Sequence, residues 1–365
     1  MIKEAISKVI LKEDLNQTEM EQVMREIISK EATPTQIASF ITALRMKGET
    51  VEEITAAVKV FREKILRIFG GDDLISLDRE EITVERETII KTANKSEDGT
   101  NIFNISTATA FVVAGMELKV AKSIRRSLSP YCGCADVVEA LGINIELTRS
   151  QLERSLNELG ICFIYEPLAT NGLEHILSIR RRIGIRTIFN LIDPLLNPAD
   201  AKFQLLGVYE PDLTEKIAYV GKNLGIKRGL VFYGEDTLDE ISVTGKTKIT
   251  EILNGGIRSY FIEPEDVGME RHKPIDLKGG TKKENAEIIL EILKGKKGAP
   301  RDVTLINAAG AFLISGKVHH FKEGIELAIY SIDSGAALNK FEKLIEFTKK
   351  ERTYFRNLFE VEPSL

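Results

Sequence analysis

Short apolar segments alternate with amphipathic helical patterns along the chain after residue 88, and this alternation constrains the fold most strongly. The segments with the length and composition of strands are 88–91, 118–121, 161–165, 204–208 and 228–233. Helical patterns lie between or after them, at 106–115, 135–141, 151–159, 212–224, 283–293, 304–313 and 322–334. Strands that alternate with helices predict an α/β fold, a mostly parallel sheet covered by helices.

The first 70 residues have a different pattern. Apolar residues recur at helical spacing, beginning with Ile2 and Ile10, and Pro34 follows Thr33 as it does at the start of a helix. Thr50 and Glu53 have the spacing of a capping box for a further helix, which we expect to reach about Phe69. The sequence therefore predicts a small N-terminal domain of four helices over 1–70 and a larger α/β domain over 71–365.

Composition excludes several classes of protein. The chain has 365 residues, 43% hydrophobic and 29% charged, which is typical of a folded domain pair and not of a disordered or fibrous chain. Its net charge of -5 argues against a nucleic-acid partner. No apolar run is long enough to span a membrane, and three cysteines are too few for a disulfide framework. We expect a cytoplasmic protein.

Parallel sheets bind ligands at the carboxyl ends of their strands, so the segments that follow the predicted strands are the candidate sites. Asn104, Ser106 and Thr107 stand where a loop gives way to a helix, and such a helix start can hold a phosphate or the waters of a metal ion. The alternative is that Ser106 or Thr107 only caps the helix.

Cations and hydroxyls follow the next predicted strand. Lys122, Arg125 and Arg126 are suited to a phosphorylated ligand, and Ser129 adds a hydroxyl. The alternative is a solvated basic loop. Cys132 and Cys134 lie in the same stretch but lack the partners of a zinc site.

Carboxylates follow the strand at 228–233. Asp236, Asp239 and Glu240 offer the oxygen ligands that Mg²⁺ prefers, although three acids in a loop can also be surface charge. Further back, Arg180 and Arg186 belong to an arginine-rich stretch. An arginine there could clamp a carboxylate or could serve only the end of a helix.

Together and in this order, the motifs resemble those of the anthranilate phosphoribosyltransferases, a family of glycosyltransferases. The resemblance spans nearly the whole chain and rests on the runs LRMKGETVEEI, NIFNIST, VAK, GCADVVEALGINI, IRRRIGIRTIFNLIDPLLNPA, QLLGVY, DTLDEIS, GGTKKENAEIIL and NAAGAFLISGK. It implies a helical domain, completed by helices around 165–185, and a homodimer paired through that domain. It also implies Mg²⁺-dependent transfer of a phosphoribosyl group from phosphoribosyl pyrophosphate to anthranilate, in tryptophan biosynthesis.

The resemblance also implies roles for particular residues. Those expected to bind the phosphorylated donor are Asp98, Gly99, Asn104, Ser106, Thr107, Lys122 and Ser129. Ser106, Asp239 and Glu240 are expected to hold the metal, and Arg180 and Arg125 the acceptor.

The chain departs from the family pattern at both substrates. The glycine-rich phosphate loop, Gly-Thr-Gly-Gly-Asp-Gly in the family, is Asn-Lys-Ser-Glu-Asp-Gly over 94–99, and His-Gly-Asn after the lysine is Ser-Ile-Arg over 123–125. The Gly-Pro-Leu turn begins here with Asp193. Three functions fit this pattern: an anthranilate phosphoribosyltransferase, a relative with another acceptor or donor, and a non-catalytic ligand-binding protein.

Overall fold

The computed structural model describes residues 1–64, 89–90, 102–126, 132–165, 173–196, 198–199, 201–236 and 238–359, with 89–90 and the last eight residues described by their backbone only. The four predicted N-terminal helices are confirmed within this part of the chain. They are α1 (Ile2–Ile10), α2 (Gln17–Ile28), α3 (Pro34–Lys47) and α4 (Val51–Lys64). The predicted end of the fourth helix at Phe69 lies outside the described residues.

Side chains at the helix starts explain where these helices begin. Thr33 caps α3 in a reciprocal pair with Gln36, and Pro34 occupies the first helical position. The predicted capping box of α4 is confirmed, because Glu53 N donates to Thr50 Oγ1 at 3.1 Å and Thr50 N donates to Glu53 Oε2 at 2.8 Å.

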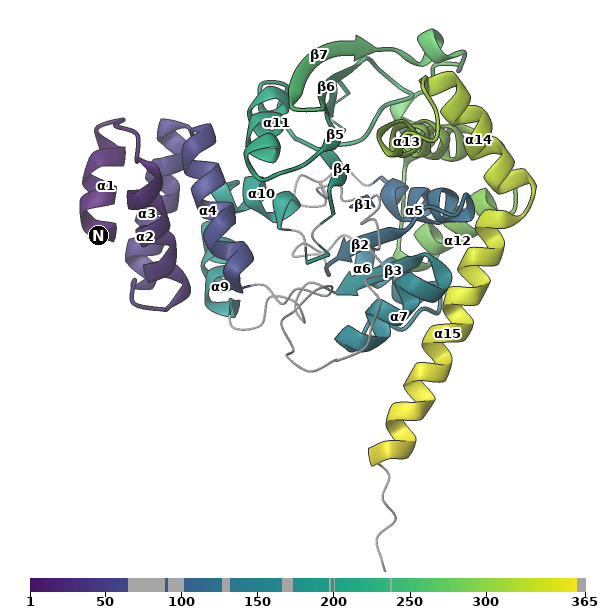
Figure 1. Ribbon diagram of the computed structural model, residues 1–365, viewed down its shortest axis with the longest axis horizontal. Helices are drawn as coiled ribbons and strands as arrows, with labels where there is room; N and C mark the ends of the chain where they lie inside the picture. The colour runs from purple at the N-terminus through teal and green to yellow at the C-terminus, as the bar shows by residue number, and fades with distance from the viewer. Residues whose placement is uncertain are drawn as a thin grey trace, which may run out of the picture.

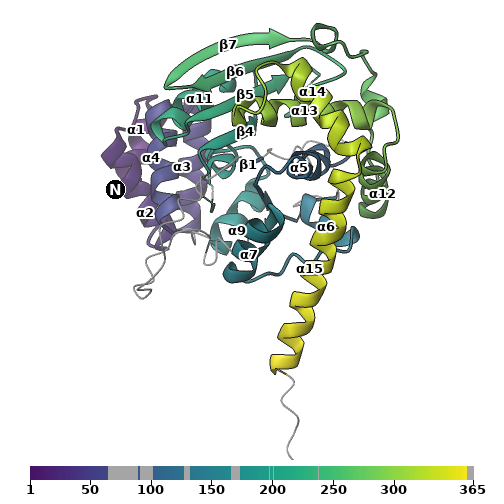
Figure 2. The same cartoon turned by 45° about the vertical axis from the view of Figure 1, so that its right-hand side comes forward.

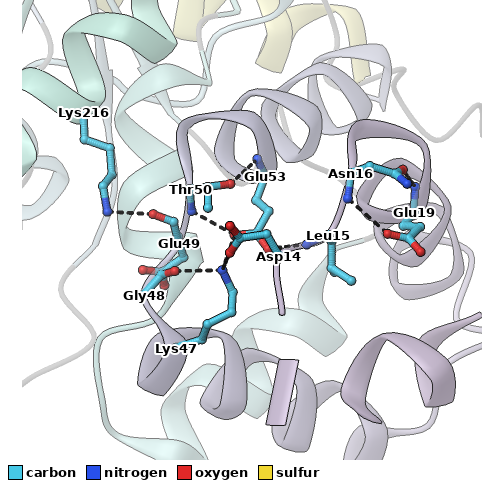
Figure 3. Close-up of polar contacts among 10 residues, drawn as sticks. All are labelled: Asp14, Leu15, Asn16, Glu19, Lys47, Gly48, Glu49, Thr50, Glu53 and Lys216. Carbon is cyan, nitrogen blue, oxygen red and sulfur yellow. Dashed lines mark hydrogen bonds and ion pairs between the residues drawn. The ribbon is translucent and has the colours of Figure 1, made fainter. Parts of the chain in front are cut away.

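Glu53 also ties the bundle together, as Figure 3 shows. Its carboxylate is fully buried and accepts hydrogen bonds from Leu15 N at 3.0 Å and from Lys47 Nζ at 3.0 Å. A buried charge is tolerated when it is paired and hydrogen-bonded, and here the pairing fixes the α1–α2 connection against the start of α4.

The α/β domain is built on two neighbouring sheets. One has the order β1 (Ile89–Ile90), β4 (Phe203–Gly207), β5 (Arg228–Gly234), β6 (Thr247–Leu253), β7 (Gly256–Ile262), and its β1, β4 and β5 are parallel. The other pairs β2 (Val120–Ile124) with β3 (Ile161–Tyr165) in parallel. Figures 1 and 2 show β1 between β4 and β2, with β7 at the outer edge. The predicted α/β fold is confirmed.

Two strands were not predicted. Strands β6 and β7 are antiparallel and join through Asn254 and Gly255, both of which have positive φ, 50° and 79°. An Asn-Gly pair between two apolar-alternating runs is the characteristic turn of a hairpin. The sheet is therefore parallel on the side of the candidate site and antiparallel at its far edge.

Helices cover both faces of the sheet. Alternate residues of β4 and β5 enter different cores: Leu205 and Leu230 pack with one set of helices, and Leu206 and Val231 with the other. The first set comprises α5 (Ile105–Gly115), α6 (Cys134–Ala140), α12 (Lys282–Leu293), α13 (Ala299–Ser315), α14 (Phe321–Asp333) and α15 (Ala336–Phe359), with α7 (Arg149–Leu159) against α15 and β3. The second contains α11 (Leu213–Asn223) and the N-terminal bundle.

Two later helices lie against the N-terminal bundle. Helix α9 (Glu174–Ile183) contacts α3, and α10 (Ile188–Ile192) contacts α3 and α4. Figure 1 shows both beside the purple helices. The remaining short elements are the 3-10 helices η2 (Asp193–Leu195), η3 (Pro264–Val267) and η4 (Pro274–Leu277). In the described part of the chain, no helix is both long and apolar enough to cross a membrane.

Candidate active site

The start of α5 presents buried polar side chains. Asn104 is the residue before the helix, and Ser106 and Thr107 lie in its first turn; all three are buried. None of these side chains caps the helix: Asn104 Oδ1 accepts a hydrogen bond from Asn285 Nδ2 at 3.4 Å, and no described residue pairs with Thr107 Oγ1. The observed contacts thus favour a ligand-facing helix start over a simple cap.

Lys122 is the cation that meets this helix start. It lies within β2, because the strand runs to Ile124 and not only to residue 121 as the sequence predicted. Its side chain is 1% exposed, and its Nζ donates to Ser106 Oγ at 2.8 Å. Two residues sixteen positions apart are thereby brought into one polar cluster, with a buried ammonium beside the N-terminal, positive end of a helix dipole.

Asp239 and Glu240 lie in the loop after β5, and both are buried. The loop is held from α13, where Asn307 accepts from Ile241 N at 3.0 Å and donates to Ile241 O at 2.9 Å. A Cβ added to Gly207, the last residue of β4, would lie 1.9 Å from the carbonyl oxygen of Asp239. Only glycine allows this approach, which seats Asp239 at the carboxyl end of β4.

The strand pairing places the acidic loop at one edge of the sheet. Strand β1 runs parallel to β4, with Ile90 opposite Leu205, so the carboxyl ends of both strands lie at the same edge of the sheet. The end of β4 contacts Asp239. The acidic loop therefore lies at this edge of the sheet, where open α/β sheets bind ligands.

Asp236 has a structural role in the same loop. Its carboxylate accepts hydrogen bonds from the hydroxyls of Ser242 and Thr244 and from Leu238 N. These contacts close the turn that carries Asp239 and Glu240. Of the three acids that the sequence suggested, Asp236 therefore stabilises the turn, and Asp239 and Glu240 remain the candidate metal ligands.

The donor set fits Mg²⁺. Within the described residues, no group of three or more His, Cys, Asp or Glu side chains is arranged around a common point. Mg²⁺ does not require one, because it commonly binds through one or two carboxylates and completes its shell with water and substrate phosphates. Asp239 and Glu240 are the candidate carboxylate ligands, and Ser106 is a further candidate oxygen ligand.

Arg125 and Arg180 share one carboxylate. Arg125 Nη1 lies 3.0 Å and Arg180 Nη1 lies 2.9 Å from Asp193 Oδ2. Arg180 stands in the last turn of α9, yet its side chain reaches Asp193 in η2 and lies over the ring of Phe189, with 5.5 Å to the centroid. The sequence suggested either a carboxylate clamp or a helix-end cation. Arg180 contacts a carboxylate of the protein itself, so its contact with a ligand stays a prediction.

Arg126 points elsewhere. It pairs with Glu139 and Asp136 of α6 and with Tyr165 Oη at the end of β3. These contacts direct Arg126 to α6, and its suitability for a phosphorylated ligand stays a prediction. Of the other candidate residues, Asp98, Gly99 and Ser129 lie outside the described residues, as do the altered phosphate loop 94–99 and its Glu97.

All three cysteines are free thiols. Arg125 N donates to Cys134 Sγ at 3.5 Å, so Cys134 helps to fix the backbone of Arg125. Burial raises the pKa of Cys162 to about 12. Burial, with Asp136 nearby, raises the pKa of Cys132 to about 11.

Comparison with known proteins agrees with this arrangement. Residues 94–338 match the model of the glycosyl transferase family α/β domain, and residues 3–65 match that of its helical bundle domain. The chain is 50% identical to the anthranilate phosphoribosyltransferase of Geotalea daltonii, over 95% of this chain and 99% of the relative.

Two solved structures are also similar. The anthranilate phosphoribosyltransferase of Thermus thermophilus superposes with a TM-score of 0.83 at 33% identity, covering 94% of this chain and 99% of the other. The Saccharomyces cerevisiae enzyme in complex with phosphoribosyl pyrophosphate and Mg has a TM-score of 0.81 at 28% identity, covering 96% and 98%.

Proposed function

The chain belongs to the glycosyl transferase family that includes the anthranilate phosphoribosyltransferases, and from this membership we propose that it transfers a phosphoribosyl group from phosphoribosyl pyrophosphate to anthranilate. The reaction requires Mg²⁺ and belongs to tryptophan biosynthesis. The observation that carries the proposal is the contact of buried Lys122 with Ser106 at the start of α5, which places a cation at the N-terminal end of a helix, where the helix dipole also favours an anion such as pyrophosphate.

Each group has a role that its position supports. Pyrophosphate leaves C1 of the ribose as that carbon gains positive charge, so catalysis depends on stabilising the departing anion and on placing the amine in line. Lys122 and the helix start bind pyrophosphate oxygens, with Asn104, Ser106 and Thr107 as the polar wall. Asp239 and Glu240 hold Mg²⁺, which neutralises phosphate charge when bound. Arg180 and Arg125 are on the acceptor side.

The first experiment follows anthranilate fluorescence with the purified full-length protein, phosphoribosyl pyrophosphate and MgCl₂. Transfer to the amine consumes anthranilate, so the fluorescence should fall at a rate proportional to enzyme concentration, and EDTA should stop the fall. Unchanged fluorescence at high enzyme concentration would rule out the anthranilate reaction.

Calorimetry with phosphoribosyl pyrophosphate then separates the remaining functions. Heat of binding that depends on Mg²⁺ would support a relative with another acceptor. No heat with or without Mg²⁺ would leave a different donor or a non-catalytic role.

We also propose a homodimer formed through the helical domain, to which α9 and α10 are added. The supporting observation is exposed apolar surface on the contacting helices α1 and α3: Ile10 is 64% exposed, Leu11 71% and Met46 81%. Light scattering of the wild-type protein should give twice the mass of one chain. The variant with glutamate at these three positions should have the mass of one chain. A wild-type monomer would contradict the proposal. The free thiols support a cytoplasmic location.

A further inference from the structure

We propose that Asp193 is a specificity-determining residue of the acceptor pocket, because it occupies the arginine pair with a carboxylate of the protein itself and so disfavours an acceptor carboxylate relative to an uncharged polar group. The inference rests on the proposed function for the assignment of Arg180 and Arg125 to the acceptor side. It concerns the chemical class of the acceptor, an aromatic amine whose neighbouring substituent is charged or neutral.

The geometry of the three residues is fixed by three different elements. Arg180 lies on α9 and is 7% exposed in its side chain, Asp193 begins η2, and Arg125 follows β2. The backbone of Arg125 is held against α6, where Ala135 N donates to Arg125 O at 3.2 Å and Cys134 Sγ accepts from Arg125 N. Both guanidinium groups direct Nη1 to the same atom, Asp193 Oδ2.

A shared carboxylate oxygen changes what the pair can bind. The contacts place two cations and one anion within hydrogen-bond distance, at 3.0 and 2.9 Å. An incoming carboxylate must either displace Asp193 or lie beside it, and the second arrangement sets two like charges a few ångströms apart. An uncharged amide or hydroxyl meets no such repulsion.

In the part of the chain that the structure describes, two other nearby arginines have partners elsewhere. Arg126, the next residue after Arg125, is paired with Glu139 and Asp136 of α6. Arg186, further along the arginine-rich stretch, lies over the ring of Tyr209 at 4.1 Å from its centroid. Among the described residues, Arg125 and Arg180 are therefore the cations seen to contact Asp193, and an acceptor carboxylate must share them with it.

The test is Asp193→Asn, which keeps the shape and one accepting oxygen but removes the charge. We expect the KM for anthranilate to fall about tenfold, which is about 1.4 kcal/mol at 25 °C. The KM for anthranilamide, which has the same ring and amine but no charge, should change less than twofold. The values of kcat and the KM for phosphoribosyl pyrophosphate should stay at the wild-type level.

Glu139→Gln is the matched control, because it removes an acid paired with Arg126 outside the pocket. It should leave the ratio of the two acceptor KM values unchanged. An unchanged or higher anthranilate KM in Asp193→Asn, or equal shifts for both acceptors, would overturn the inference. Where the wild-type protein shows no turnover, dissociation constants for the two acceptors from calorimetry make the same comparison, so the inference and the proposed function fail on different results.

Discussion

At the scale of single residues, the candidate site depends on charges that are out of contact with bulk water. Lys122 is 1% exposed, and Asp239 and Glu240 are each 7% exposed. Interactions of buried charges with a ligand are screened less than those at the surface, so each group contributes more to binding there. Substitutions of these residues should consequently alter ligand binding far more than those of exposed charges of the same kind.

Lys122→Met should lower kcat/KM for phosphoribosyl pyrophosphate by about 100-fold, because it removes a buried cation from the phosphate-binding helix start. Initial rates at varied donor concentration measure the effect. Lys222→Met, at an exposed position of α11, is the control and should retain wild-type kinetics. A Lys122 variant with normal donor kinetics would exclude this lysine from the phosphate site.

Asp239→Asn combined with Glu240→Gln should abolish Mg²⁺-dependent binding of phosphoribosyl pyrophosphate, since neutral amides are poor ligands for Mg²⁺. Calorimetry with and without MgCl₂ measures this, and thermal unfolding checks that the chain still folds. Glu235→Gln, on the exposed side of the same loop, should keep the metal dependence. Metal-dependent binding that survives the double substitution would contradict the assignment.

At the scale of elements, the site is positioned by contacts between a loop and distant parts of the fold. Asn307 on α13 holds Ile241 by both its backbone groups, and Gly207 at the end of β4 allows the close approach of Asp239. Both residues act on the acidic loop without contributing a metal ligand. They are positioning residues, and their effect should appear in stability and in metal affinity together.

Asn307→Ala should lower the free energy of unfolding by about 2 kcal/mol, because two buried backbone groups of Ile241 lose their partner. It should also raise the Mg²⁺ concentration needed for half-maximal activity. Urea unfolding and Mg²⁺ titration measure the two effects. Asn339→Ala, exposed on α15, should change neither. A loss of stability with an unchanged Mg²⁺ requirement would refute the positioning role.

Elements with local signals were predictable from the sequence, and contacts between distant residues were not. Capping residues and the spacing of apolar residues predicted the four N-terminal helices. Short apolar segments between helical patterns predicted β3, β4 and β5. The hairpin of β6 and β7 was missed although Asn254 and Gly255 carried its signal. The strand predicted at 118–121 ends before Lys122 because that residue is charged, whereas β2 continues to Ile124. The contact of Lys122 with Ser106 shows why a lysine is tolerated within this strand. The sharing of Asp193 by two arginines is a tertiary contact that spacing cannot reveal.

At the scale of the whole molecule, polar contacts join the helical bundle to the α/β domain. Lys216 Nζ on α11 donates to the carbonyl oxygen of Glu49 at 2.6 Å, as Figure 3 shows, and Arg45 pairs with Glu210 at 2.6 Å. Glu49 stands between α3 and α4, and its side chain is buried. Among the described residues, none pairs with its Oε1.

Glu49→Gln should make stability less dependent on pH. Burial raises the pKa of Glu49 above its ordinary value of 4.5. The folded protein therefore binds this proton more tightly than the unfolded chain does, and stability falls as the pH rises from about 4.5 through the folded pKa. Glutamine does not titrate, so the variant does not lose this stability. The difference in melting temperature, variant minus wild type, should therefore be larger at pH 7 than at pH 4. The same difference at both pH values would contradict the prediction.

The chain is suitable for site-selective labelling, because Cys134 and Cys162 are buried and the partly exposed Cys132 has a raised pKa. At pH 7, the thiol of Cys132, with a pKa of about 11, is a thiolate in only about one molecule in ten thousand. The thiolate fraction of Cys162 is lower still. Cys134 is 4% exposed and out of reach of reagents. A maleimide dye should consequently attach almost only to a cysteine introduced at an open position, such as Tyr330→Cys on α14, where the native side chain is 63% exposed. Fluorescence reporters of substrate binding can therefore be installed without first removing the native thiols.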